Sequence, residues 1–204
     1  MSEKKTVFLI CPVRGIIEEE KKYLEGFING WETPGYKLHY PPRDTNQNDP
    51  TGLNICRENR AAIIKSESVI LYYNPTSTGT YFDIGMTFAA RKPLFTLNAG
   101  ALDKEELSPL ERFINVYSDN DFGEVETLND YPYILNREER RDEIKRSLLV
   151  PYEWKDKDPE FLFDFGMAFM LEKTIVLNNR TYVESQRTPH KSFQNVLLEL
   201  DKRA

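Results

Sequence analysis

Residues 68–98 read SVILYYNPTSTGTYFDIGMTFAARKPLFTLN, and the prediction of the fold begins from this segment. Its first part, residues 68–73, is an apolar run of strand length, and residues 93–98 (PLFTLN) form a second one. Between them, the turn-forming segment NPTSTGT leads into residues 81–91, which we expect to form a helix. A strand, a helix and a strand joined by such short links favour parallel strands with a right-handed crossover.

The same alternation of strands and helices extends toward the N-terminus. Residues 7–11 (VFLIC) predict a buried parallel strand, and apolar residues keep a helical spacing within residues 16–31. A short strand is expected at 36–40 and a helix at 53–65, whereas the intervening PPRDTNQNDPTG is polar and proline-rich and predicts only a loop. We therefore predict an α/β fold, Rossmann-like or flavodoxin-like, with a mostly parallel sheet and helices on both faces.

The second half of the chain repeats part of the first. FDIGMTFAARKPLFTLN, which begins at Phe82, reappears as FDFGMAFMLEKTIVLNN, which begins at Phe163. The upstream stretch AAIIKSESVILYYN is echoed by RDEIKRSLLVPYEW, so a βα unit with its preceding helix is partly duplicated. The matched pairs are Phe82/Phe163, Asp83/Asp164, Gly85/Gly166, Met86/Met167, Phe88/Phe169, Lys92/Lys173, Leu97/Leu177 and Asn98/Asn178.

The repeat divides the chain into three parts. Residues 1–100 form the first α/β half, and residues 101–135 form an acidic connecting segment. Residues 136–204 form a second, degenerate repeat packed in the same globular unit. This last part ends in a helix that helical spacing predicts at residues 192–200.

Composition excludes several classes of protein. Of the 204 residues, 40% are hydrophobic, which is enough for a core and excludes general disorder. The net charge of -6 gives no bulk attraction to nucleic acid, and the N-terminal apolar run is too short for a signal peptide or a membrane span. Cys11, Cys56, His39 and His190 lack metal-type spacing. We expect a cytoplasmic protein with no metal, cofactor, nucleic acid or membrane partner.

The expected site lies beyond the carboxyl ends of the strands, where loops and helix N-termini meet. Ser77, Thr78, Gly79 and Thr80 precede a helix whose first N–H groups are unpaired, so a phosphate or a sugar hydroxyl would fit there. The alternative is that a hydroxyl simply caps the helix. Asp83 projects toward the same side and is a candidate nucleophile or ribose anchor. The alternative is that it only interacts with the helix dipole, because acidic residues are common in first turns.

The loops after the first two strands add candidate ligand contacts. Arg14, beside Gly15, and Arg43 are loop cations that could meet a phosphate, although solvated loop charge is the commoner outcome. Asp44 and Asp49 are either acceptors for sugar hydroxyls or ordinary Asx-turn residues, and we favour the turns.

Polar side chains also occur on the second expected helix and at the end of the third strand. Asn59 and Arg60 lie on an otherwise apolar stripe, so they either satisfy loop carbonyls or reach the ligand. Tyr72 and Tyr73 end a strand beside the candidate site. Because strand side chains alternate, we expect one of the two to face it.

The segment Ser77-Thr78-Gly79-Thr80-Tyr81-Phe82-Asp83-Ile84-Gly85, followed by Lys92-Pro93, resembles the D-S-G-T-x-x-E-hydrophobic-G motif of the nucleoside 2-deoxyribosyltransferase family and its nucleotide N-glycosidase relatives. The resemblance covers roughly residues 6–98. It implies that Asp83 stands where the family's nucleophilic Glu attacks the sugar anomeric carbon, releases the base and forms a glycosyl-enzyme. Two residues depart from the motif: Asp83 is one methylene shorter than Glu, and Ser77 replaces an Asp that helps to hold the base.

The resemblance implies a small-molecule nucleoside or nucleotide as partner. Enzymes of this family complete their sites with residues from a neighbouring subunit, so we hypothesise a homo-oligomer or, through the duplication, an internal pseudo-dimer. The second copy keeps Asp164 but lacks the Ser-Thr-Gly-Thr segment, and we interpret it as mainly structural.

Three functions remain open at this point. The first is cleavage of an N-glycosidic bond, or deoxyribosyl transfer, by the carboxylate of Asp83. The second is a catalytically inactive module of the same fold that binds or senses a nucleotide-derived ligand. The third is an interaction protein without a small-molecule site.

Overall fold

The computed structural model describes residues 4–32, 35–103, 105–119 and 132–201. A four-stranded parallel sheet has the order β2-β1-β3-β4, and β5 pairs in parallel with β6. This arrangement confirms the predicted α/β fold with a mostly parallel sheet flanked by helices. The elements are β1 (Lys5–Ile10), α1 (Glu18–Glu32), β2 (Tyr36–His39), α2 (Pro41–Asp44), α3 (Leu53–Lys65), β3 (Ser68–Leu71), α4 (Thr78–Ala89), β4 (Leu94–Thr96), η1 (Ala99–Leu102), α5 (Pro109–Asp119), α6 (Pro132–Arg146), β5 (Leu149–Tyr152), α7 (Pro159–Met170), β6 (Thr174–Leu177), α8 (Arg180–Ser185) and α9 (Phe193–Leu200).

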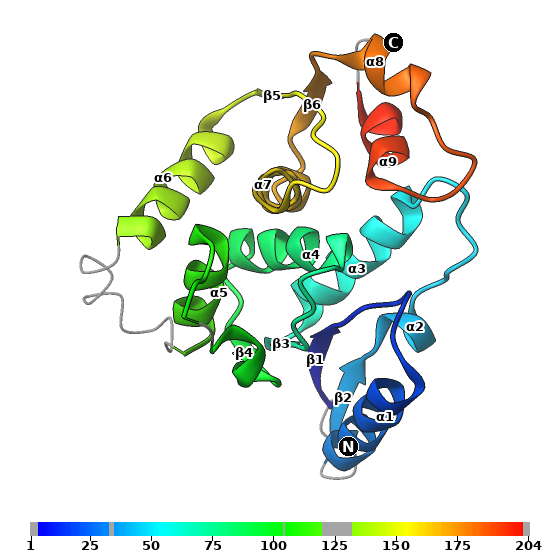
Figure 1. The fold of residues 1–204 in the computed structure, drawn as a ribbon, viewed down its shortest axis with the longest axis vertical. Coiled ribbons are helices and arrows are strands. Elements are labelled where there is room, and N and C mark those ends of the chain that lie inside the picture. The colour runs from blue at the N-terminus through cyan, green and yellow to red at the C-terminus, as the bar shows by residue number, and fades with distance from the viewer. Residues whose placement is uncertain (1–3, 33–34, 104, 120–131, 202–204) are drawn as a thin grey trace.

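The four-stranded sheet separates two hydrophobic cores. On one face, Val7 and Leu9 of β1 pack with Leu24 of α1. On the other face, Phe8 and Ile10 join the larger core, which also contains residues of α3, α4 and α5. Figure 1 shows α1 on one side of this sheet and α3 and α4 on the other. The alternation of strand side chains thus places a helical layer on each face.

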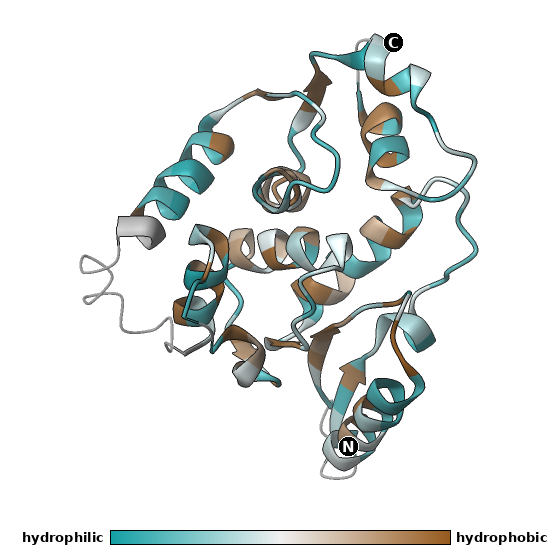
Figure 2. Cartoon of the chain, in the orientation of Figure 1, coloured by the Kyte–Doolittle hydropathy of each residue, from teal (hydrophilic) through white to brown (hydrophobic). Residues whose placement is uncertain are grey.

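Hydrophobic residues gather in the middle of the molecule. Figure 2 shows brown segments on α4, α7 and the strands, whereas α6 and much of α1 are teal. In the described part of the chain, no helix combines the length and the apolarity that crossing a membrane requires.

Two segments carry more structure than the sequence predicts. The expected loop PPRDTNQNDPTG contains α2, because proline fits the first turn of a helix, where an N–H group would lack a partner anyway. The prediction of a loop is therefore wrong for these four residues. The connecting segment contains α5, which buries Phe113, Ile114 and Tyr117 in the larger core. Within this segment, residues 104 and 120–131 lie outside the described residues.

The helices α4 and α7 cross at the centre of the molecule (Figure 1). A Cβ atom added to Gly85 would overlap the carbonyl oxygen of Phe163, and one added to Gly166 would overlap that of Phe82. The two contacts are reciprocal, because Phe82 and Gly85 match Phe163 and Gly166 in the repeat. Reciprocal contacts between equivalent residues are the pattern of a twofold interface, formed here within one chain.

The hydrogen bonds at the end of the repeat set its register. The Asn98 side chain bonds the backbone N–H and carbonyl of Tyr73, and the Asn179 side chain bonds those of Trp154 in the same way. Asn98 therefore corresponds to Asn179 and not to Asn178. The last two predicted pairs are wrong by one residue, and the repeat runs without a gap through β4 and β6.

Candidate functional site

A cavity of about 450 Å³ opens between the two halves of the chain. The first half lines it with the loop after β1, with α3 and with the start of α4, and the second half with the loop after β5, α7 and the start of α9. The candidate residues that line it are Arg14, Asn59, Ser77, Thr78, Gly79 and Asp83. The structure thus brings together predicted residues from three separate segments.

Asp83 is a buried carboxyl in the wall of this cavity. Its side chain lies among apolar and weakly polar neighbours in the lining, including Cys11, Cys56 and Phe82. Burial raises the pKa of Asp83 to about 7, and a hydrogen bond from Asn59 opposes that rise. Near neutral pH the group therefore exists both as a carboxylate and as a carboxylic acid.

A chain of hydrogen bonds leads to Asp83 from the end of β2. The amide Nδ2 of Asn59 donates to Oδ2 of Asp83 at 3.4 Å, and Oδ1 of Asn59 accepts from the Thr45 hydroxyl at 2.9 Å. The hydroxyl of Thr45 in turn lies 2.9 Å from Nε2 of His39. Because the Thr45 proton points at Asn59, its oxygen accepts from His39. The network fixes the orientation of the Asn59 amide and positions one oxygen of Asp83.

The start of α4 leaves its polar groups available to the cavity. Ser77 is the N-cap residue, but its side chain makes no capping hydrogen bond. The hydrogen bond that a simple capping role of Ser77 requires is therefore absent from the described structure. The Ser77 and Thr78 side chains line the cavity beside Gly79, where the positive end of the helix dipole lies.

Arg43 and Asp44 are engaged away from the cavity. The Arg43 guanidinium pairs with Glu32 at 2.9 Å and with Asp44 at 2.8 Å, and it donates to the carbonyl of Leu38. The Asp44 carboxylate also accepts from the backbone N–H of Tyr40. These contacts join α2 to α1 and β2, so the expected ligand role of both residues is replaced by a local structural one.

Two further candidates do not line the cavity. Gly15 has a φ of 71°, which suits a turn after β1, and nothing lies within 4 Å of a Cβ added there. Thr80 is buried, and its hydroxyl has no hydrogen-bond partner in the described structure. It belongs to the first turn of α4 but not to the lining.

The structure distinguishes the alternatives left open for Asp49 and for the pair Asn59 and Arg60. Asp49 accepts from the backbone N–H groups of Thr51 and Asn54, as the turn interpretation predicts. Arg60 donates to the carbonyl of Met170 at 3.0 Å, whereas its neighbour Asn59 reaches Asp83. Arg60 therefore bonds a backbone carbonyl, which is the first alternative, whereas Asn59 lines the cavity, which is the second.

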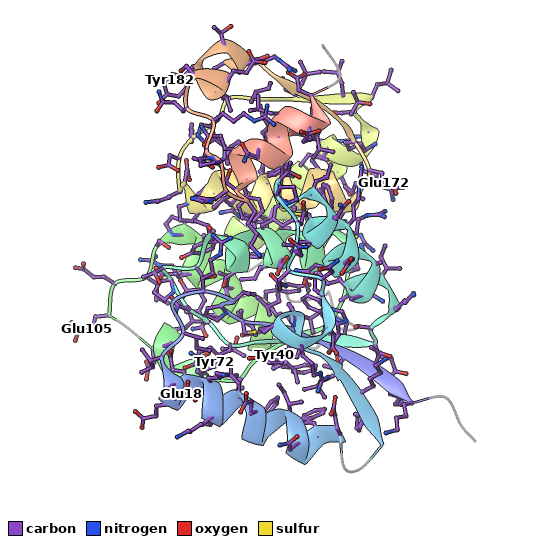
Figure 3. The ribbon with its side chains drawn as sticks, turned by 90° about the vertical axis from the view of Figure 1, so that its right-hand side faces the viewer. Glu18, Tyr40, Tyr72, Glu105, Glu172 and Tyr182 are labelled. Atoms are coloured by element: carbon purple, nitrogen blue, oxygen red, sulfur yellow. The ribbon has the colours of Figure 1, made fainter. Side chains whose placement is uncertain are left out.

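Neither tyrosine at the end of β3 faces the cavity. Tyr72 donates to Glu20 at 2.9 Å and lies near α1 in Figure 3. Tyr73 donates to Glu111 and lies 3.2 Å from the Tyr81 hydroxyl. The two side chains do alternate, and each packs on one face of the sheet, whereas the cavity lies at the loop before α4 and its first turns. The expectation that one of them faces the site is wrong.

Sequence reasoning missed the wall that the second half supplies. Trp154, Lys157, Lys191 and Phe193 line the cavity, although they lie far from Asp83 in the chain. No local pattern marks them as site residues. The one signal that points to this half is the internal repeat, from which we hypothesise a pseudo-dimer.

Within the described residues, no three His, Cys, Asp or Glu side chains cluster so that they could hold a metal ion. Comparisons of the chain with models of protein families, with curated proteins and with solved structures find no match.

Proposed function

We propose that the cavity binds a nucleoside or nucleotide and that Asp83 cleaves its N-glycosidic bond. The observation that carries this proposal is the buried Asp83 carboxyl in the wall of a cavity that both halves of the chain enclose. A group whose pKa lies near neutrality at such a position is a candidate for catalysis. The resemblance of Ser77–Gly85 to the deoxyribosyltransferase motif supports the same chemistry.

In the proposed reaction, the ionised carboxylate attacks the anomeric carbon of the sugar. A C–O bond to Asp83 forms while the C–N bond to the base breaks, and the bond's electron pair leaves with the base, which takes up a proton from water. Water, or the nitrogen of an acceptor base, then displaces Asp83 and regenerates the carboxylate. The first acceptor makes the protein a hydrolase and the second makes it a transferase.

The remaining lining residues suit the parts of such a ligand. The hydroxyls of Ser77 and Thr78 can bond sugar hydroxyls or phosphate oxygens. Trp154 and Phe193 provide aromatic surface, on which a base can stack for about 1–3 kcal/mol. The base would thus contact the second half of the chain, while the sugar lies at the first.

A second candidate is a binding module that has lost the reaction. The observation that favours it is the short side chain of Asp83, which stands where the resembling family has Glu and is tied to Asn59. A carboxylate held back by roughly 1.5 Å loses much of the benefit of close positioning. In this case a nucleotide would bind without turnover.

The test is an assay of free-base release by chromatography over a panel of nucleosides and nucleotides. We expect release by the wild type and none by Asp83→Ala. Asp164→Asn is the matched control, because it alters the equivalent carboxyl outside this cavity. A ligand that raises the melting temperature without base release, and that binds Asp83→Asn with unchanged affinity, would establish the binding module instead.

A further inference from the structure

Two cations from opposite halves of the chain line the cavity without an ion-pair partner. Arg14 belongs to the loop after β1, and Lys191 belongs to the segment that leads into α9. Lys191 donates to the carbonyl of Gln47 at 3.1 Å and to its side-chain oxygen at 3.0 Å, which are neutral acceptors. Among the described residues, neither Arg14 nor Lys191 forms a salt bridge, so both retain an unneutralised charge at the cavity.

The two charges are close enough to affect each other. Burial lowers the pKa of Lys191, and the charge of Arg14 lowers it further. Asp49 opposes this effect, but its carboxylate already accepts from the N–H groups of Asn54 and Ile55. An anion bound between like charges removes their repulsion and gains charge-assisted hydrogen bonds.

The rest of the lining leaves this positive region uncompensated. Its other charged residues are Asp83, Asp156 and Lys157, and the last two have opposite charges. Asp83 has a pKa near 7 and is only partly ionised at neutral pH. The cavity therefore presents excess positive charge in a protein whose net charge is -6.

The second copy shows what binds at the equivalent helix end. The Asp158 carboxylate accepts from the N–H groups of Glu160 at 3.0 Å and Phe161 at 3.3 Å, so α7 carries its own anion. In the first copy Ser77 stands at the equivalent position and caps nothing. The start of α4 thus opens into the cavity with space for an anion from outside the chain.

We propose that a phosphomonoester group of the ligand binds where Arg14, Lys191 and the start of α4 line the cavity. This inference rests on the proposed function for the rest of the ligand and makes that ligand a nucleotide. Lys191 comes from the degenerate repeat, so this half of the chain determines specificity in addition to supporting the fold.

The experiment is calorimetric titration of the full chain with inorganic phosphate, with 2′-deoxynucleosides and with their 5′- and 3′-monophosphates. We expect one monophosphate series to bind at least about tenfold more tightly than the matching nucleosides, since hydrogen bonds between a cationic side chain and a phosphate are stronger than those between neutral groups. Lys191→Gln and Arg14→Gln should each remove about tenfold of that preference and leave nucleoside affinity within about twofold. Lys22→Gln, on the outer surface of α1, removes the same charge outside the cavity and should change nothing.

Several results would overturn the inference. Equal affinity for nucleosides and both monophosphate series would do so, as would monophosphate affinity that survives both Lys191→Gln and Arg14→Gln. If Lys191→Gln fails to fold, Arg14→Gln decides, because Arg14 makes no hydrogen bond in the described structure that its loss would break. Lys191-dependent binding of monophosphates without base release would uphold this inference and refute the glycosidase. Base release without a phosphate preference would do the reverse.

Discussion

Asp83 and Asp164 occupy equivalent positions on α4 and α7, but their partners differ. Asp83 faces the neutral amide of Asn59 at 3.4 Å, whereas Asp164 forms an ion pair with Arg140 at 2.7 Å. Arg140 is the repeat equivalent of Asn59, so the two partners hold the same position on the helices that precede α4 and α7, Asn59 on α3 and Arg140 on α6. The exchange of an amide for a guanidinium thus leaves Asp83 without a cationic partner, whereas Asp164 is neutralised by an ion pair within the fold.

The second site is filled by its own side chains. Arg137, the equivalent of Cys56, pairs with Glu160, the equivalent of Gly79. Asp158 caps α7 in place of the uncapped Ser77 of α4. The same backbone therefore supports an open cavity in one half and an internally satisfied set of charges in the other.

The sheets of the two halves differ in the same way. β3 pairs with both β1 and β4, whereas β5 pairs only with β6 among the described strands. Pro151 of β5 is the repeat equivalent of Ile70 of β3. The N–H groups of β3 alternate between its two neighbouring strands, and that of Ile70 points toward β1. Proline lacks this N–H, so the edge of β5 is protected against pairing with another strand.

The largest expected effect separates the two aspartates. Asp83→Ala should lower base release by roughly 10³-fold or more, because it removes the proposed nucleophile. Asp164→Asn should leave the rate within about twofold, with any loss of stability arising from the lost ion pair with Arg140, which keeps Glu143 as its remaining partner. Steady-state rates on the best nucleotide of the panel measure both. Equal losses in the two variants would contradict the difference drawn between the sites.

The crossing of α4 and α7 should be intolerant of any side chain at its closest point. Gly85→Ala and Gly166→Ala each place a Cβ against a backbone carbonyl, and each should cost roughly 2–4 kcal/mol of unfolding free energy. Gly26→Ala is the matched control on α1, where a Cβ meets nothing within 4 Å, and it should stabilise by about 0.5–1 kcal/mol. Urea denaturation measures all three. A neutral Gly85→Ala would show that the helices do not cross as described.

Asn59→Arg should make the first site resemble the second. The introduced guanidinium would pair with Asp83, hold the carboxylate away from the sugar and lower the pKa of Asp83. Base release should fall by about 30-fold, while Asn59→Asp, which introduces no cation, should raise the pKa of Asp83 instead. The pH–rate profile distinguishes the two variants, because its acid limb should move to lower pH only in Asn59→Arg.

A further expected effect is on the pH dependence of the free energy of unfolding. The pKa of Asp83 rises from its ordinary value of 3.8 to about 7 on folding, so the folded state binds the proton more tightly. The free energy of unfolding should therefore decrease as pH rises from about 4 to 7. Asp83→Asn should lose this part of the decrease. Asp164→Asn should lose a smaller part, since Arg140 opposes the effect of burial on the pKa of Asp164. Urea titrations at several pH values measure the difference.

Local patterns predicted most of the helices and strands. The helix expected at 53–65 is α3, with the same bounds, and the strand expected at 7–11 overlaps β1. Two boundaries failed for identifiable reasons. α4 begins at Thr78 and not at residue 81, because its polar first turn resembles the preceding turn segment. The α2 helix was missed because its prolines were interpreted only as breakers.

The site was predictable only in its first half. Ser77, Thr78, Gly79 and Asp83 are close in sequence and belong to one loop and helix, so the motif alone places them together. Arg43 could not be assigned from sequence, because its pairing with Glu32 depends on how α1 lies against α2. Long-range packing of this kind leaves no periodic signal.

The alternation of strand and helix, the duplication and the position of Asp83 at a helix start followed from the chain itself. These features depend on neighbouring residues, whose apolar spacing and turn chemistry act locally. The contact between Asn59 and Asp83, and the position of Trp154 and Lys191 in the cavity wall, depend on long-range packing. The physical reason is that α4 and α7 must meet at Gly85 and Gly166, which brings distant segments around one carboxyl.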